Sequence, residues 1–231
     1  MGVLDLLFPK RCVSCKAFGS YLCADCFARL SFTTSDICLV CNRGSIDSLT
    51  HPGCRTTYAI DGAFTSLVYT GVAKRLLYAF KYKPFLSDLQ EVLTDLFYEG
   101  LIQKERFHTV LAKDPILVPI PLYILKLRKR GYNQVDVLSR GLNKKLELQS
   151  KQLLQRVKNT PSQYKLSREE RMRNVKDAFR IKENSKPIIA GKTVFLVDDV
   201  LTSGATLSEA AKVLKRGGAK AVFGLALAHG Q

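Results

Sequence analysis

Two adjacent carboxylates follow an apolar run near the C-terminus and precede a turn that contains hydroxyls and a glycine. The run is Val194–Val197, and Asp198 and Asp199 come directly after it. Acids at the carboxyl end of a buried strand point into the crevice where α/β sheets bind ligands. The turn offers backbone N–H groups, hydroxyls and a helix N-terminus to one phosphate, through Thr202, Ser203, Gly204, Ala205 and Thr206. We therefore expect a sugar phosphate here, with its vicinal hydroxyls on the acids.

All seven cysteines lie before residue 55, mostly in pairs that are separated by two residues. This spacing presents two thiolates to one ion, and two such pairs complete a tetrahedral zinc site. The eight candidate ligands are Cys12, Cys15, Cys23, Cys26, Cys38, Cys41, His51 and Cys54. An odd number of cysteines fits one site of four cysteines and one of three cysteines and a histidine better than it fits paired disulfides.

The sequence leaves the pairing of these ligands open. The pairs can combine in chain order, or Cys12 and Cys15 can share a metal with Cys38 and Cys41. His51, which precedes a proline, can also be an ordinary loop residue. Both pairings fill all four coordination positions, so we predict one or two structural zinc ions that supply much of the module's folding free energy.

Beyond the cysteines, apolar strands alternate with amphipathic helices. Helical spacing of apolar residues runs through residues 72–80, 89–97, 135–146 and 207–214. Strands are expected at Ile60–Tyr69, Ile116–Pro119, Thr193–Val197 and Ala221–Leu227. Strands that are apolar throughout indicate an α/β fold with a parallel sheet covered on both faces. We expect a small zinc-binding domain in residues 1–57 and the parallel-sheet domain in residues 58–231.

Positive charge is concentrated in one part of the chain. The whole chain carries 36 Lys and Arg against 20 Asp and Glu, whereas residues 116–190 alone hold 18 against six. Within them, residues 153–187 have few long apolar periods, and a capping box at Ser167–Glu170 predicts a short helix. We interpret this segment as a mobile basic lid that attracts polyanions, with a solvated lysine-rich surface as the plainer alternative.

Two classes of protein are excluded by the apolar pattern. No apolar stretch approaches the roughly 20 residues that span a bilayer. The first nine residues contain an acid and no small-residue cleavage site, which argues against a secretory signal. We expect a cytoplasmic protein without a membrane span.

The thirteen residues Val194–Thr206 resemble, over their whole length, the phosphoribosyl-pyrophosphate motif of the type I phosphoribosyltransferases. The resemblance implies that Asp198 and Asp199 bind the ribose hydroxyls and that Thr202–Thr206 wraps the 5′-phosphate. It also implies Mg²⁺ with phosphoribosyl pyrophosphate, and a pyrophosphate loop after Pro121. Cations that could serve that loop or a nucleic acid are Lys81, Arg128, Arg130, Arg156, Lys158 and Arg171.

The wider chain is similar to the ComF competence proteins, which join an N-terminal zinc finger to a phosphoribosyltransferase-like domain. The matching blocks are the cysteine pairs, Ala79–Tyr82, Val118–Pro121, Arg128–Gln134, Gln163 with Leu166–Asn174, and the motif Val194–Thr206. The family is implicated in natural transformation, where it acts on incoming single-stranded DNA at the cytoplasmic face alongside a helicase-like ATPase. His51 departs from the family pattern, which typically has Cys in the second finger.

Three functions are consistent with these features. The first is a DNA-uptake factor whose phosphoribosyl pocket binds a ligand or a DNA end and whose basic lid grips single strands. The second is an active phosphoribosyltransferase of the amidotransferase or nucleobase-salvage type. The third is a zinc-dependent docking module for a motor ATPase, with a vestigial pocket. The intact acid pair argues against the third, and the absence of a recognisable acceptor-base pocket weakens the second.

Overall fold

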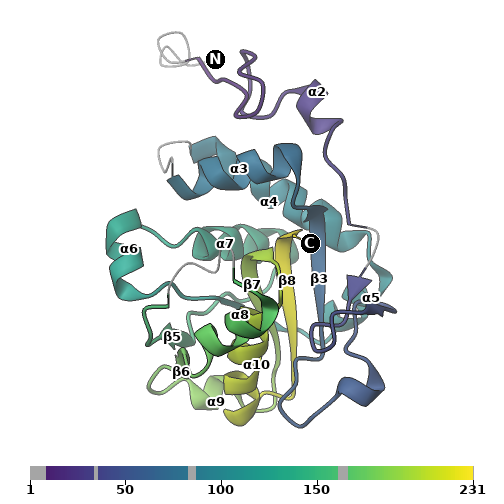
Figure 1. The fold of residues 1–231 in the computed structure, drawn as a ribbon, viewed down its shortest axis with the longest axis vertical. Helices are drawn as coiled ribbons and strands as arrows, with labels where there is room; N and C mark the ends of the chain where they lie inside the picture. Colours follow the sequence, from purple (N-terminus) through teal and green to yellow (C-terminus); the bar gives the residue numbers. More distant parts are fainter. Residues whose placement is uncertain (1–8, 34–35, 83–86, 161–165, 231) are drawn as a thin grey trace.

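The structure, a computed structural model, describes residues 9–33, 36–82, 87–160 and 166–230. Its centre is a four-stranded sheet with all strands parallel, in the order β3-β8-β7-β4 (Figure 1). The strands are β3 (Gly62–Val68), β4 (Ile116–Pro119), β7 (Thr193–Leu201) and β8 (Ala221–His229). They are almost entirely buried, which explains their continuous apolar sequence and confirms the predicted α/β class with a parallel sheet.

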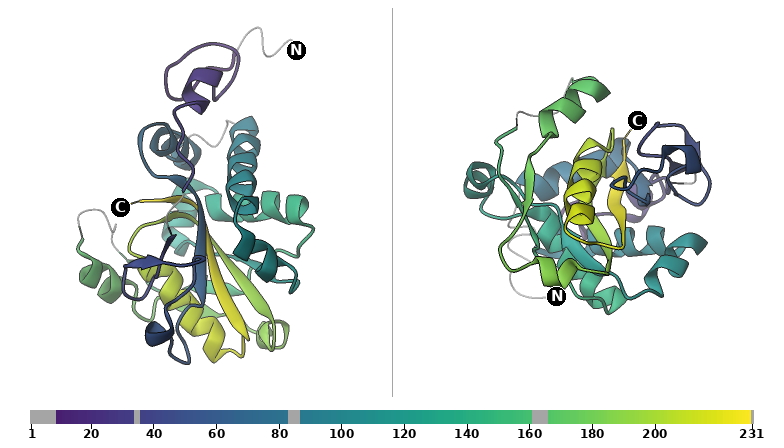
Figure 2. Two further views of the ribbon diagram at one scale, coloured as in Figure 1. Left: turned by 90° about the vertical axis from the view of Figure 1, so that its right-hand side faces the viewer. Right: turned by 90° about the horizontal axis from the view of Figure 1, so that it is seen from below.

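Helices cover both faces of this sheet. On one face, α4 (Ser87–Ile102) and α7 (Gln134–Leu146) pack against the strands, and on the other lies α10 (Ala205–Arg216) (Figure 2). The helix α8 (Arg168–Val175) packs against the outer side of α10. Each face of the sheet therefore has its own apolar layer.

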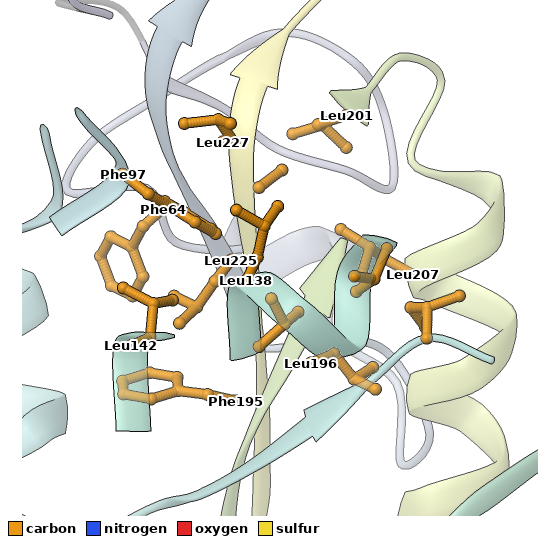
Figure 3. Close-up of a cluster of buried hydrophobic side chains, with 14 of the residues drawn as sticks. Phe64, Phe97, Leu138, Leu142, Phe195, Leu196, Leu201, Leu207, Leu225 and Leu227 are labelled. Atoms are coloured by element: carbon orange, nitrogen blue, oxygen red, sulfur yellow. The ribbon is translucent and has the colours of Figure 1, made fainter. Parts of the chain in front are cut away.

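Successive residues of β7 serve these two layers in turn. Phe195 points to the side of Leu142 in α7, whereas Leu196 points to the side of Leu207 in α10 (Figure 3). On the α7 side the core also takes in α5 (Glu105–Leu111), whose Phe107 ring lies 5.4 Å from the ring of Phe195. The period-2 alternation of a strand is what lets one segment pack against both helix layers.

Two further helices follow the carboxyl ends of strands. After β3, α3 (Gly71–Tyr82) lies across the end of the sheet, and after β4 comes α6 (Ile124–Arg130), which buries no residue (Figure 1). The periodicity predicted α3 through its buried Leu76, Leu77 and Phe80. It did not predict α6, because that helix has no buried apolar face to create a pattern.

The cysteine-rich part contains short elements only. They are α2 (Ala24–Phe27), β1 (Asp36–Ile37), β2 (Gly44–Ser45) and the 3₁₀ turn η1 (Pro52–Cys54). In Figure 1 the segment with α2 lies beyond α3, while the chain from β1 onward runs along the sheet domain. Regular structure is too sparse here to hold a core without additional links.

The segment 153–187 is more regular than the sequence indicated. β5 (Leu154–Arg156) and β6 (Phe179–Ile181) pair as an antiparallel ribbon that brackets α8, and α9 (Lys186–Ile189) follows. Strands of three residues are too short to show a period, so the ribbon was missed. The predicted capping box is confirmed, because Ser167 Oγ accepts the Glu170 N–H and Glu170 accepts the Ser167 N–H. Residues 161–165 of the predicted lid lie outside the described residues.

None of the helices in the described part of the chain is long and apolar enough to cross a bilayer.

Candidate functional site

The two adjacent acids lie inside β7, which continues four residues further than the sequence predicted. Val200 and Leu201 still pair with β8. On the other side, β4 pairs with β7 only as far as Val197. Asp198 and Asp199 therefore occupy the point where the sheet opens between β7 and β4, at the carboxyl ends of the strands. Ligands of parallel α/β sheets bind at this end.

Asp199 is held by side chains from two helices. Its Oδ2 lies 2.8 Å from Lys81 Nζ of α3 and accepts a 2.8 Å hydrogen bond from Gln134 Nε2 of α7. The residue is only 6% exposed. Burial acts to raise the pKa of Asp199, but the Lys81 charge and both hydrogen bonds outweigh it and lower that pKa. Asp199 is therefore an ionised carboxylate whose partners lie within the protein.

Asp198 has a different electrostatic environment. Its Oδ1 accepts the Asp199 backbone N–H at 2.9 Å. Burial, followed by repulsion from Asp199, raises the pKa of Asp198 from 3.8 to about 7. The two neighbouring acids thus differ in ionisation, because the charge of Asp199 is balanced by Lys81 whereas Asp198 changes its charge near neutral pH.

The turn after β7 encloses a small hollow of about 40 Å³, which is lined by Asp198 and Val200–Leu207. Gly204 adopts φ 72°, a left-handed conformation that suits glycine, and α10 begins at the next residue. The first N–H groups of a twelve-residue helix therefore border the hollow. Its volume is comparable with a few water-sized groups, such as the oxygens of one phosphate.

The back of this turn is covered by the cysteine-rich part. A Cβ added to Gly204 would lie 3.0 Å from Leu39 Cδ2, so the two are in close contact. Leu39 is buried, and Arg168 Nη2 of α8 donates to the carbonyls of Leu39 and Val40 at 2.8 Å each. The short segment between Cys38 and Cys41 thus joins the turn to α8.

Three of the six predicted cations lie near the acids. Lys81 pairs with Asp199, and Arg130 donates to Gln134 Oε1, which makes it a neighbour of the same carboxylate. Arg156 donates to Thr160 and acts to lower the pKa of Asp198. Its Nε is buried without a hydrogen-bond partner in the described part of the chain. A buried N–H without an acceptor is costly, so a phosphate oxygen beside Arg156 would be stabilising.

The other three predicted cations do not approach the acids. Lys158 Nζ donates to the Lys176 carbonyl at 2.8 Å, and Arg171 Nε donates to the Leu166 carbonyl at 3.0 Å. Arg128 is exposed on α6. Gln134 and Leu39, by contrast, contact the site although we did not predict them. Gln134 closes the matching block Arg128–Gln134, which was a usable signal, whereas nothing in the sequence marks Leu39.

The cysteine and histidine ligands form two groups in chain order. One group is Cys12, Cys15, Cys23 and Cys26, and the other is Cys38, Cys41, His51 and Cys54. Within each group the ligand atoms all lie within 4.8 Å of one another. Tetrahedral zinc at about 2.3 Å from each sulfur requires sulfurs about 3.8 Å apart, so both groups fit the metal. The interleaved pairing is not the one that the structure shows.

The geometry of His51 suits a metal ligand. Its Nδ1 lies 3.3 Å from Cys41 Sγ, and its Nε2 lies 2.8 Å from the Gly44 carbonyl. A histidine whose Nε2–H donates to a backbone carbonyl keeps its Nδ1 lone pair for the metal. The three-cysteine, one-histidine set is therefore complete, and zinc there would have a structural role because no coordination position stays open.

Comparison with protein families assigns most of the chain. Residues 112–230 match the model of the phosphoribosyl transferase domain, and residues 3–56 match that of the double zinc ribbon domain. The first match contains the acids and the turn, and the second contains all eight metal ligands. Both agree with the fold and with the two ligand groups.

Similar curated proteins are named for competence or for DNA utilization. Competence protein F of Haemophilus influenzae is 37% identical over 143 residues, which are 61% of this chain and 62% of that protein. DNA utilization protein YhgH of Escherichia coli K12 is 29% identical over 94% of this chain and 96% of its own length. Competence protein ComFC of Bacillus subtilis is 28% identical over 89% and 83%. The chain belongs to the phosphoribosyl transferase domain family, and with its zinc ribbon it is similar to the ComF/ComFC competence proteins.

Proposed function

We propose that this protein handles single-stranded DNA during uptake or use of DNA, and that its C-terminal domain binds phosphoribosyl pyrophosphate or a related sugar phosphate. The observation that carries the pocket is the hollow between Asp198 and the turn at Thr202–Thr206, beside the start of α10. The orphaned Nε of Arg156 adds a donor for a second phosphate. Mg²⁺ bound with the pyrophosphate would neutralise its charge.

The two acids contribute differently to this pocket. Asp198 lines the hollow, so it would accept hydrogen bonds from the ribose hydroxyls. Asp199 is paired with Lys81 and hydrogen-bonded to Gln134, so it would fix the positions of β7, α3 and α7 relative to one another beneath the sugar. Free thiolates that bind zinc are kept in a reducing compartment, which supports a cytoplasmic location. The protein partner there would be a helicase-like ATPase.

The pocket is tested by ligand-induced stabilisation. Phosphoribosyl pyrophosphate with Mg²⁺ should raise the melting temperature of the native protein, and it should raise that of Asp198→Asn by a smaller amount. This substitution keeps the Lys81–Asp199 pair, so its fold should persist. Glu183→Gln, at an exposed site in the basic segment, is the charge-matched control and should respond like the native protein. An unchanged melting temperature in the native protein would reject the pocket.

The pH dependence of binding gives a second test of Asp198. Because its pKa is about 7, the carboxylate that accepts hydroxyls forms as the pH rises through neutrality. Affinity should therefore increase between pH 6 and pH 8, and Asp198→Asn should remove the part of the increase that exceeds the titration of the ligand. The raised pKa also means that this residue stabilises the unliganded fold at pH 4 and that its contribution is lost as the pH rises through 7.

One observation favours an active phosphoribosyltransferase as a second candidate. A cavity of about 470 Å³ adjoins the end of β4, lined by Pro121, Leu127, Tyr132 and Arg156 among others. This volume lies within the range of small-molecule sites, so an acceptor could be accommodated. Pyrophosphate release measured with each nucleobase and with ammonia decides between enzyme and binder, since a binder releases none above the rate without acceptor.

A further inference from the structure

Two large aromatic side chains on α3 face solvent. Tyr78 and Tyr82 are 63% and 60% exposed, although the same helix buries Leu76, Leu77 and Phe80. A spacing of four residues places them on one side of the helix. Their ring centroids lie 4.7 Å apart with an interplanar angle of 47°. Contiguous exposed apolar surface marks interaction sites, whereas apolar residues that are exposed singly are ordinary.

The surroundings of these rings are positively charged. Arg130 of α6 lies over the Tyr82 ring, 5.6 Å from its centroid. The helices α3 and α6 carry seven basic side chains and no acidic one. The seven are Lys74, Arg75, Lys81, Lys126, Arg128, Lys129 and Arg130. Lys81 is committed to Asp199, and the others leave a field that attracts an anion.

The ring pair is continuous with the site around Asp199. Lys81, which pairs with that carboxylate, is the chain neighbour of Tyr82. Arg130, which lies over the Tyr82 ring, donates to Gln134, and Gln134 donates to Asp199. A ligand that covers the rings would therefore lie beside the proposed sugar-phosphate pocket.

We propose that Tyr78 and Tyr82 form a stacking platform for the bases of a single-stranded nucleic acid whose phosphates lie on the cations of α3 and α6. Single strands expose the faces of their bases, and aromatic rings among cations bind them without regard to sequence. A duplex hides those faces, and a free sugar phosphate has no base to stack. The platform rests on the proposed DNA handling and places it outside the predicted lid.

The rings and the cations make separable contributions to affinity. The double variant Tyr78→Ala with Tyr82→Ala should bind a labelled oligothymidylate at least tenfold more weakly, since the bases lose both rings on which they stack. The dependence of affinity on salt should stay the same, because no phosphate contact is lost. Lys129→Gln removes one phosphate contact and keeps both rings, so the slope of log affinity against log salt concentration should fall in magnitude by about 0.7. Anisotropy titrations at four salt concentrations measure both quantities.

Matched variants separate stacking from general damage. Tyr78→Phe with Tyr82→Phe keeps both rings and should keep the affinity. Tyr58 is also an exposed ring beside a cation, since it is 42% exposed and Arg216 lies 5.2 Å from its ring centroid. It precedes β3 whereas α3 follows that strand, so Tyr58 and the ring pair belong to opposite ends of β3. Tyr58→Ala should therefore bind like the native protein. Melting temperatures should agree among all these variants.

Each alternative outcome has a defined meaning. Undiminished binding by the double alanine variant overturns the platform and leaves DNA handling intact, whereas failure of the native protein to bind overturns both. The platform is also overturned if the double alanine variant loses as much affinity for duplex DNA as for single-stranded DNA, or if the double Phe variant loses as much affinity as the double Ala variant. So does unchanged DNA binding with lost binding to a helicase-like ATPase, which would assign the rings to a protein contact.

Discussion

The two metal-ligand groups have similar ligands but are joined to the molecule in different ways. The first group is linked to the sheet domain through side chains, which include Arg75 with Ser14 and Lys10 with Asp88, and its Cys12 and Cys26 belong to the buried hydrophobic cluster. The second is continuous with the sheet, because Thr50 N–H donates to Asp61 and Ala63 N–H donates to Ser48. Similar ligand spacing therefore creates a module that is joined through side chains in one place, and in the other a segment that is joined through the backbone and covers the turn after β7.

The difference matters because the second group covers the turn at residues 202–206, where we propose that phosphate binds. The segment between Cys38 and Cys41 places Leu39 against Gly204 and offers two carbonyls to Arg168. The first group instead leaves Phe18 and Phe27 exposed. We expect metal loss at the second group to affect ligand binding, and metal loss at the first group to leave it intact.

Removal of one metal at a time should produce the largest difference. Cys38→Ser with Cys41→Ser and Cys12→Ser with Cys15→Ser should each lower the zinc content by one ion per chain. Structural zinc contributes on the order of 10 kcal/mol of apparent binding energy, so Cys38→Ser with Cys41→Ser should lower the melting temperature of the sheet domain and abolish stabilisation by sugar phosphate. Cys12→Ser with Cys15→Ser should keep the melting temperature of the sheet domain and its stabilisation by sugar phosphate. Equal behaviour of the two variants would remove the distinction.

Leu39→Ala tests the contact itself with the metal retained. The loss of a buried leucine should lower the free energy of unfolding by about 2–5 kcal/mol, and the zinc content should stay the same. Amide hydrogen exchange at residues 202–206 should accelerate without any ligand present. Phe18→Ala, an exposed apolar residue near the first group, is the control and should cost less than about 1 kcal/mol. Unchanged exchange at the turn would show that Leu39 does not support it.

Arg168→Gln should have a smaller effect. It removes two charged hydrogen bonds to the Leu39 and Val40 carbonyls, so we expect a loss of about 1–3 kcal/mol and faster proteolysis in α8. Denaturant titration measures the first, and timed digestion measures the second. Arg173→Gln, exposed on the same helix, should match the native protein. If the two variants behave alike, α8 is not anchored by the second group.

The smallest effect is expected at the first group. Arg75→Gln removes hydrogen bonds to Ser14 that are exposed to solvent, so the free energy of unfolding of the sheet domain should change by less than about 0.5 kcal/mol. The neighbouring Lys74→Gln serves as control in the same denaturant titration. A large loss in Arg75→Gln alone would mean that the first group also stabilises the sheet domain.

Long periodic elements were predictable from the sequence, whereas short or fully exposed ones were not. The run of buried residues in α3 and the apolar strands of the sheet have local patterns that need no tertiary information. α6 has no buried residue, and the ribbon of β5 and β6 has three residues in each strand. The boundary between residues 57 and 58 stays a prediction, as do the roles of the site residues.

Within the site, residue types were predictable and partners were not. The adjacent acids and the turn predict a phosphate site by their chemistry alone. Which acid is neutralised depends on Lys81 and Gln134, which lie 118 and 65 residues before Asp199 in the chain. No local pattern carries contacts over such separations, so their assignment required the packed structure.

The sequence by itself determined the candidate metal ligands, the parallel sheet and the turn after the two acids, because short spacing and periodicity are local properties of the chain. Only the tertiary structure decided that the ligands group in chain order, that Leu39 contacts the turn, and that Tyr78 and Tyr82 stand exposed on the helix whose Lys81 pairs with Asp199. These features arise when helices and loops far apart in sequence share one end of a sheet. The burial of each side chain at that end, and the charge around it, depend on which helices and loops pack beside it.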